Sequence, residues 1–177
     1  MIKKNVLALI TLLTLSFIQT IIYSQSNPTA QELPYYSNFS SLSHNSTTYP
    51  AGWQGWKISS LSDGNFNTSA PSSSSSLTSR GYASSTTKGI YNYSSKLGFL
   101  NAFDGEYSLV LSVKTTGNSN VVVEYAVMTL RNPYNGSSNT RINGVELQYR
   151  IGTSGEFKSI NSRVYINNTT NQTGTTT

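Results

Sequence analysis

The sequence has no cysteine, a single histidine and few charged residues, which make up 11% of its 177 residues. Without cysteine the chain cannot form disulfides, so a domain of this length must be stabilised by its hydrophobic core. The histidine, His44, lies in the polar stretch SLSHNSTTYP without a neighbouring carboxylate or nucleophile, which favours a solvated loop residue over a general base. The 7 acidic residues are widely spaced and form no evident carboxylate pair. We therefore predict that this chain is not itself an enzyme.

The N-terminus has the pattern of a signal peptide. Lys3 and Lys4 precede an apolar run from about Val6 to Ile22, and polar residues follow it. The run is diluted by Thr, Ser and Gln and falls short of the roughly 20 strongly apolar residues of a spanning helix, which favours cleavage over retention as an anchor. We predict that residues 1–24 are a signal peptide, that the protein is secreted or displayed at the cell surface, and that the mature chain has no stable membrane span.

The mature chain carries only a weak positive charge. Loss of the two N-terminal lysines leaves 10 basic against 7 acidic residues, a net charge of +3. The basic residues are scattered along the chain, whereas nucleic-acid-binding proteins usually have a basic stripe or cluster. We therefore predict no nucleic-acid binding by this domain.

The main secondary-structure signal is a two-residue alternation of apolar and polar side chains, typical of β-strands. It is clearest in GVELQYRI, residues 144–151, and no stretch has a sustained helical period. Turn residues in TTGNSN, 115–120, predict a hairpin between two further strands. The other expected strands are Tyr35–Phe39, Tyr107–Val113, Val121–Val127, Phe157–Ile160 and Arg163–Ile166. This pattern predicts an all-β fold, an antiparallel β-sandwich of jelly-roll-like type.

Composition divides the chain into a polar leader at residues 25–32, the sandwich domain at 33–166 and a low-complexity tail at 167–177. The Ser-rich stretch Ser69–Gly89 is expected to be a long surface loop, with a linker as the alternative. The tail NNTTNQTGTTT lacks the apolar strand that would finish a sheet. We therefore expect a domain that is incomplete at its C-terminus, with a bare strand edge near Tyr35–Phe39 and a tendency to self-associate.

Both tryptophans, Trp53 and Trp56, lie in the stretch TYPAGWQGWKIS. They are either an exposed platform for a ligand such as a sugar ring or part of the hydrophobic core. A tryptophan buries on the order of 200 Å², and a sandwich without disulfides needs such filling. We predict Trp53 in the core, whereas Trp56 could contribute to binding if it proves exposed.

The polar loop RNPYNGSSNTRING, residues 131–144, is a candidate binding site. Amide, guanidinium and phenol groups on one loop suit sugar recognition, and long loops are often functional, although the same composition also suits an ordinary connection. The candidate ligand-binding residues are Arg131, Tyr134, Asn135, Asn139 and Arg141, with Trp56 if exposed.

The stretch NAFDGEYS, residues 101–108, is a candidate metal site. Asn101, Asp104 and Glu106 could offer oxygen ligands to a structural calcium ion, although the spacing is not that of an EF-hand loop. A plain turn at Asp104-Gly105 is the alternative. No other cofactor is predicted.

Three stretches resemble an N-terminal β-sandwich domain of secreted multidomain Bacteroidetes proteins: LPYYSNFSSL, YPAGWQGWKIS and KLGFLNAFDGEYSLVLSVKTTGNSNVVVEYAVMTLRNPYNGSSNTRINGVELQYRIGTSGEF. The resemblance extends from about Leu33 to Phe157. It implies type IX secretion and, in some relatives, following endonuclease/exonuclease/phosphatase or lamin-tail modules. In that family the domain continues beyond the position of Thr177, which implies a C-terminally truncated copy, and no catalytic residue can be carried over.

These observations favour a non-catalytic secreted accessory module of a larger extracellular or cell-surface protein. Its expected partners are an extracellular glycan or downstream domains of the same protein. Two alternatives stay open: a carbohydrate-binding module, and the N-terminal piece of a secreted nuclease or phosphatase whose catalytic domain lies outside this chain.

Overall fold

The chain forms strands where short apolar runs alternate with Gly, Ser and Asn turns. The computed structural model describes residues 26–59, 66–71, 73–100, 105–131 and 143–167. Within these ranges there is no helix, so the predicted all-β class is confirmed. The strands are β1 (Trp53–Ser59), β2 (Ser73–Ser75), β3 (Leu77–Thr78), β4 (Gly89–Asn92), β5 (Leu97–Leu100), β6 (Glu106–Leu111), β7 (Gly144–Tyr149) and β8 (Lys158–Ile166).

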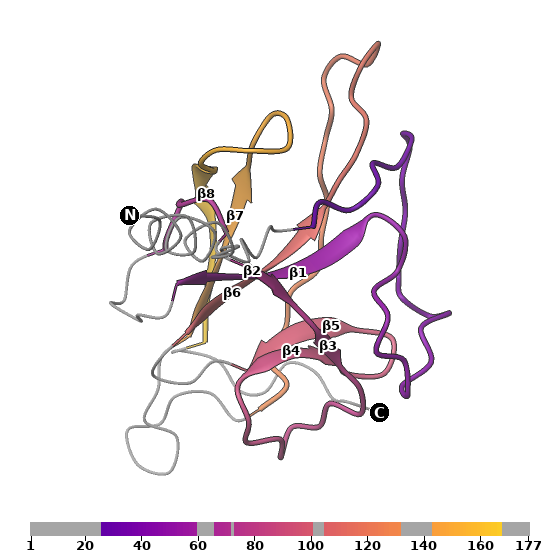
Figure 1. Ribbon diagram of the computed structural model, residues 1–177, viewed down its shortest axis with the longest axis vertical. Coiled ribbons are helices and arrows are strands. Elements are labelled where there is room, and N and C mark those ends of the chain that lie inside the picture. Colours follow the sequence, from indigo (N-terminus) through magenta and orange to yellow (C-terminus); the bar gives the residue numbers. More distant parts are fainter. Residues whose placement is uncertain (1–25, 60–65, 72, 101–104, 132–142, 168–177) are drawn as a thin grey trace, which may run out of the picture.

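The strands make three small sheets, with orders β2-β1-β6, β3-β4-β5 and β7-β8 (Figure 1). β1 is the middle strand of the first sheet and pairs antiparallel with both neighbours, with Trp53 opposite Leu111 and Trp56 opposite Ser108 on β6. β3 pairs parallel with β4, whereas β4 with β5 and β7 with β8 are antiparallel. The sandwich arrangement and its jelly-roll-like type stay predictions.

The β2-β1-β6 sheet is packed on both faces. Successive residues of β1 point to opposite sides, and both sides make contacts. Gly55 faces β4, where an added Cβ would lie 2.5 Å from Ile90 Cδ1. Trp56 points to the other side, with its ring centroid 6.1 Å from that of Phe157, directly before β8. β1 therefore lies between the β3-β4-β5 sheet and the connection from β7 to β8.

The hydrophobic core gathers side chains from β1, β3, β4 and the residue after β4. The buried apolar residues in the described part of the chain are Trp56, Leu77, Ile90, Tyr91 and Tyr93. Their aromatic rings supply much of the buried area, which a chain without disulfides needs for stability.

Two expected strands are wrong. In Tyr35–Phe39 the chain forms no strand: Phe39 has a φ of 58° and opens a turn in which Leu42 N donates to Phe39 O at 3.0 Å. The segment Val121–Val127 also forms no strand, and its side chains are exposed. In both places the apolar pattern suits a strand, but left-handed residues beside it redirect the backbone.

Three other expectations need correction. The Ser69–Gly89 stretch is not only a surface loop, because it contains β2 and β3 and buries Leu77. The two strands expected within 157–166 are the single strand β8. β7 is confirmed as a strand, but it does not have the one buried and one solvated face that its alternation predicts, because its residues up to Gln148 are all half-buried. On the polar face, Glu146 accepts hydrogen bonds from Gln148 Nε2 and Ser159 Oγ, both at 2.8 Å.

Candidate functional site

The turn before β1 brings an aromatic side chain to the surface. Trp53 N donates to Pro50 O at 3.0 Å, and Gly52 has a φ of +83°, which glycine adopts without strain. A side chain at Gly52 would also collide with Gln31. The turn is therefore specific for glycine, and it places Trp53 and Gln54 at the start of β1.

The Trp53 ring is held in a fixed orientation at the surface. Its Nε1 donates to Tyr35 Oη at 2.9 Å, and its centroid lies 5.1 Å from that of Phe39 in an edge-to-face contact. The side chain is half-buried rather than enclosed, so the expectation that Trp53 belongs to the core is corrected.

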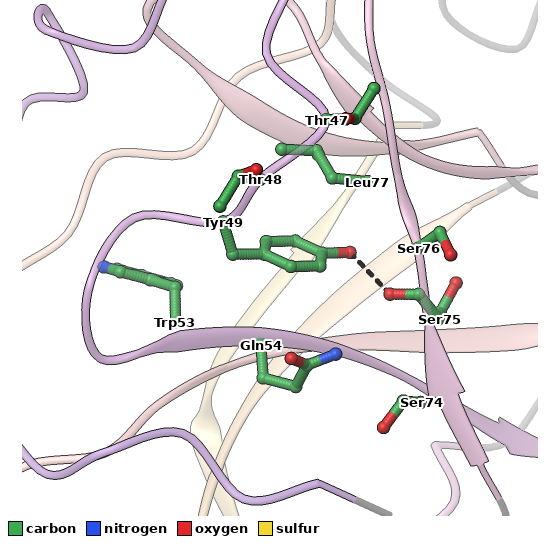
Figure 2. Close-up of a pocket in the computed structure, with 9 residues that line it drawn as sticks. All are labelled: Thr47, Thr48, Tyr49, Trp53, Gln54, Ser74, Ser75, Ser76 and Leu77. Atoms are coloured by element: carbon green, nitrogen blue, oxygen red, sulfur yellow. Dashed lines mark hydrogen bonds between the residues drawn. The ribbon is translucent and has the colours of Figure 1, made fainter.

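A pocket of about 390 Å³ opens beside Trp53, at the lower end of the roughly 300–1,000 Å³ of ligand sites. Figure 2 shows Trp53 at one end, the serines of the β2 region at the other and the Tyr49 ring between them. No charged residue is among the described residues that line it. The lining residues are Thr47, Thr48, Tyr49, Trp53, Gln54, Ser74, Ser75, Ser76 and Leu77.

Tyr49 forms the floor of this pocket. Its Oη donates to Ser75 O at 3.0 Å (Figure 2). A Cβ at residue 55 would collide with Tyr49 Oη, so the phenol fits only because residue 55 is glycine. Burial raises the pKa of Tyr49 well above its usual range, so the phenol is neutral at physiological pH.

Several neutral polar groups of the lining remain available to a ligand. The hydroxyls of Thr47, Thr48 and Ser76 make no hydrogen bond with the part of the chain that the structure describes. Gln54 Nε2 donates to Gly55 O at 2.8 Å, which leaves the amide oxygen as an acceptor. The pocket therefore offers hydroxyls, an amide and aromatic rings to a ligand.

Trp56 is not part of this pocket. It is 1% exposed, and its Nε1 donates to Ser26 O at 3.0 Å. Trp56 is therefore not exposed, as a contribution to ligand binding would require. The tryptophan that fills the core is Trp56 rather than Trp53. Burial differs because β1 turns Trp56 toward Phe157 and Trp53 toward the open pocket.

Of the predicted loop residues, the structure describes only Arg131, which is not among the residues that line this pocket. Arg131 is exposed, and its charge acts to lower the pKa of Tyr93. The other candidates of that loop, Tyr134, Asn135, Asn139 and Arg141, lie outside the described residues.

The calcium site stays a prediction. Asn101 and Asp104 lie outside the described residues, and Glu106 begins β6. Within the described ranges, no three His, Cys, Asp or Glu side chains gather as a metal site would require.

His44 is part of the packing rather than a solvated loop residue. Its Nε2 lies 3.2 Å from Gly81 O, its ring makes an edge-to-face contact with Tyr82 at 5.1 Å, and the side chain is half-buried. This contact fixes the loop before β1 against the chain between β3 and β4.

The pocket could be found only in part from the sequence. The stretch TYPAGWQGWKIS contains Tyr49, Trp53 and Gln54, and a ligand platform was one of its two interpretations. The other wall, Ser74–Leu77, comes from a serine tract that predicts only a loop.

In the described residues no helix is long and apolar enough to span a membrane.

No family model matches the chain, and searches of curated proteins and of solved structures find no match either. The resemblance to secreted Bacteroidetes domains therefore stays an expectation from the sequence.

Proposed function

We propose that the chain is a non-catalytic accessory module of a secreted or cell-surface protein and that it binds a neutral carbohydrate in the pocket of Tyr49, Trp53 and Gln54. The observation that carries the proposal is the composition of the pocket: aromatic rings and neutral hydroxyl and amide groups, with no charged side chain among the described lining residues.

This composition matches the chemistry of a sugar. The C–H groups on one face of a sugar ring carry partial positive charge and pack against the negative face of an aromatic ring such as Trp53. Sugar hydroxyls both donate and accept, so they pair with Thr and Ser hydroxyls and with the Gln54 oxygen. An anionic ligand would find no cation among these lining residues.

The hydrogen bond from Trp53 to Tyr35 supports the same proposal. It fixes the ring before a ligand arrives, so little side-chain freedom is lost on binding, and preorganisation of this kind lowers the cost of association. The accessory role, the secretion and the sandwich architecture rest on the sequence. The alternative of a leading piece of a nuclease or phosphatase rests on the resemblance alone.

Binding of the full chain to a panel of neutral and anionic oligosaccharides, followed by calorimetric titration of those retained, tests the proposal. We expect a neutral oligosaccharide to bind, Trp53→Ala and Gln54→Ala each to weaken binding at least ten-fold, and Tyr36→Ala, at an exposed aromatic outside the pocket, to leave it unchanged. Failure of every neutral glycan to bind, or equal binding by the Gln54→Ala protein, would overturn the proposal.

A further inference from the structure

A long projecting segment, residues 113–130, exposes apolar side chains that a folded protein normally covers. We call it the arm; Figure 1 shows it extending away from the sheets after β6. Val122 alone is 79% exposed. The exposed large apolar residues of the arm are Val121, Val122, Val123, Tyr125, Val127 and Met128. Several exposed apolar side chains within eight residues, 121–128, are unusual for a soluble surface and indicate an interaction site.

The geometry of its turn keeps the arm away from β6 of its own chain. Asn118 N donates to Thr115 O at 3.0 Å, and Gly117 has a φ of +80° while Thr116 has no positive φ, as in a type II turn. In a two-residue hairpin loop this turn type splays the flanking strands instead of pairing them. Asn120, with a φ of 55°, adds a second left-handed residue before the apolar segment.

The base of the arm is anchored on both sides. On one side it continues β6, and on the other Thr129 is buried with its Oγ1 2.6 Å from Tyr165 Oη on β8. The exposed segment Val121–Met128 therefore lies between two anchored ends. These anchors hold the segment in position without burying it.

The outer edge of β6 is a strand edge that fits this segment. Ser112 N donates to Gly52 O and Ser112 O accepts from Gln31 N, both at 2.9 Å, so Gln31 continues the line of β1 on the inner side. Hydrogen-bonding direction alternates along a strand, so Tyr107, Leu109 and Leu111 direct their backbone groups outward. Among the described residues, no strand pairs with that edge.

In the register set by its turn, the arm places Val122 and Val123 opposite apolar residues of this edge. The Thr115–Asn118 bond sets the antiparallel register of a hairpin, and continuing it places Val123 opposite Val110 and Val122 opposite Leu111. Paired β-branched and apolar side chains stabilise adjacent strands. Glu124, opposite Leu109, is the one charged residue of the segment.

We infer that Val121–Met128 is a strand-exchange element that pairs with the outer edge of β6 in a second copy of this chain. The second copy offers the same edge and register, and the splayed turn that separates the arm from its own β6 directs it outward. Pairing of two arms with each other about Glu124 would instead place two carboxylates opposite each other, which is unfavourable. Exchange of an identical element is a low-cost route to a dimer.

Mixed single-cysteine chains test the exchange, because the natural chain has no cysteine. Full-length Val110→Cys and Val123→Cys proteins are mixed, unfolded, refolded together and oxidised, so that only contact between two chains gives the mixed disulfide. In the proposed register this pair is not hydrogen-bonded, so its Cβ atoms are within disulfide reach. We expect the yield of this disulfide-linked dimer to be at least ten-fold higher than the yield from a mixture of Val110→Cys and Val127→Cys proteins. In that control pair the second cysteine is displaced by four residues, roughly 13 Å along the strand.

Sedimentation of charge variants gives a second readout. We expect Val122→Lys to weaken dimerisation at least ten-fold, and Ile151→Lys, at a 90% exposed site outside the arm, to leave it unchanged. Equal cross-linking by both cysteine pairs, or a disulfide formed only within single chains of a Val110→Cys/Val123→Cys protein, would overturn the inference. So would a parent chain that stays monomeric at high concentration. Glycan binding at the Trp53 pocket is measured separately and does not depend on these outcomes.

Discussion

The guanidinium carbon of Arg150 lies 4.9 Å from the centre of the Trp56 ring and 4.7 Å from the centre of the Phe157 ring. The same guanidinium donates to Asn27 Oδ1 at 2.8 Å and to the carbonyl oxygen of Gly155 at 3.2 Å. Burial lowers the pKa of Arg150 from its usual range, but a guanidinium stays charged at physiological pH. One side chain therefore links β1, the N-terminal segment and the β7-β8 connection.

Replacement of Arg150 should loosen this junction. We expect Arg150→Ala to lower the free energy of unfolding by about 2 kcal/mol, because cation–π and hydrogen-bond contacts are lost together. Arg150→Lys keeps the charge but not the planar stacking, so it should recover less than half of that loss. Urea denaturation measures both, and an Arg150→Ala protein as stable as the parent would contradict the assigned role.

Asn92 is expected to be the most sensitive polar residue of the core. It is completely buried, its Nδ2 donates to Ser43 O at 2.7 Å and to Ser46 O at 3.3 Å, and its Oδ1 accepts from Ser94 N. Asn92→Ala leaves these groups unpaired and should cost roughly 2–4 kcal/mol. Ser84→Ala, at an exposed loop position, is the control. A thermal midpoint unchanged by Asn92→Ala would show that loop 43–46 is held by other contacts.

Stability should decline in alkali through Tyr93. Burial, reinforced by Tyr91 and opposed by Arg131, raises the pKa of Tyr93 from 10.0 to about 12. The unfolded chain therefore loses this proton first as the pH rises, so the stabilisation is complete below about pH 10 and is lost between pH 10 and 12. The size of this stabilisation is about 3 kcal/mol, because one pKa unit corresponds to roughly 1.4 kcal/mol. Tyr93→Phe should flatten the fall in unfolding free energy over that interval, and an equally steep fall in the variant would assign the effect to other groups.

Removal of an unpaired hydroxyl should stabilise the protein. Ser108 Oγ on β6 is buried and has no hydrogen-bond partner in the described residues. Ser108→Ala is therefore expected to raise the free energy of unfolding by about 1 kcal/mol, whereas Ser112→Ala, just after the end of β6, should change it little. A destabilised Ser108→Ala protein in chemical denaturation would indicate that the hydroxyl has a partner in solution.

Local pattern was sufficient to predict β6, β7 and the turn at Thr115–Asn118, because strand propensity and turn chemistry agree there. It failed at Val121–Val127, where the alternation predicts a strand but the left-handed Gly117 and Asn120 turn the chain away from β6. Such failures are tertiary, since period-two alternation does not say which edge a strand meets.

The candidate site shows the same limit. Alternation along β1 indicates that Trp53 and Trp56 face opposite sides, but not which side is enclosed. That depends on Phe157 and Arg150, about 100 residues further along the chain, covering the Trp56 side. The serine tract 73–76 likewise contains no local signal for a pocket wall, because its position follows from pairing with β1.

Trp53 and Trp56 have different roles, and the fluorescence of single-tryptophan variants distinguishes them. Trp53→Phe leaves Trp56 as the reporter, and Trp56→Phe leaves Trp53. The structure predicts that Trp56 emits at shorter wavelength, resists quenching by acrylamide and ignores added oligosaccharide, whereas Trp53 is readily quenched and a bound oligosaccharide protects it. Equal quenching of both, or a ligand response from Trp56 alone, would contradict the assignment of Trp56 to the core and Trp53 to the binding pocket.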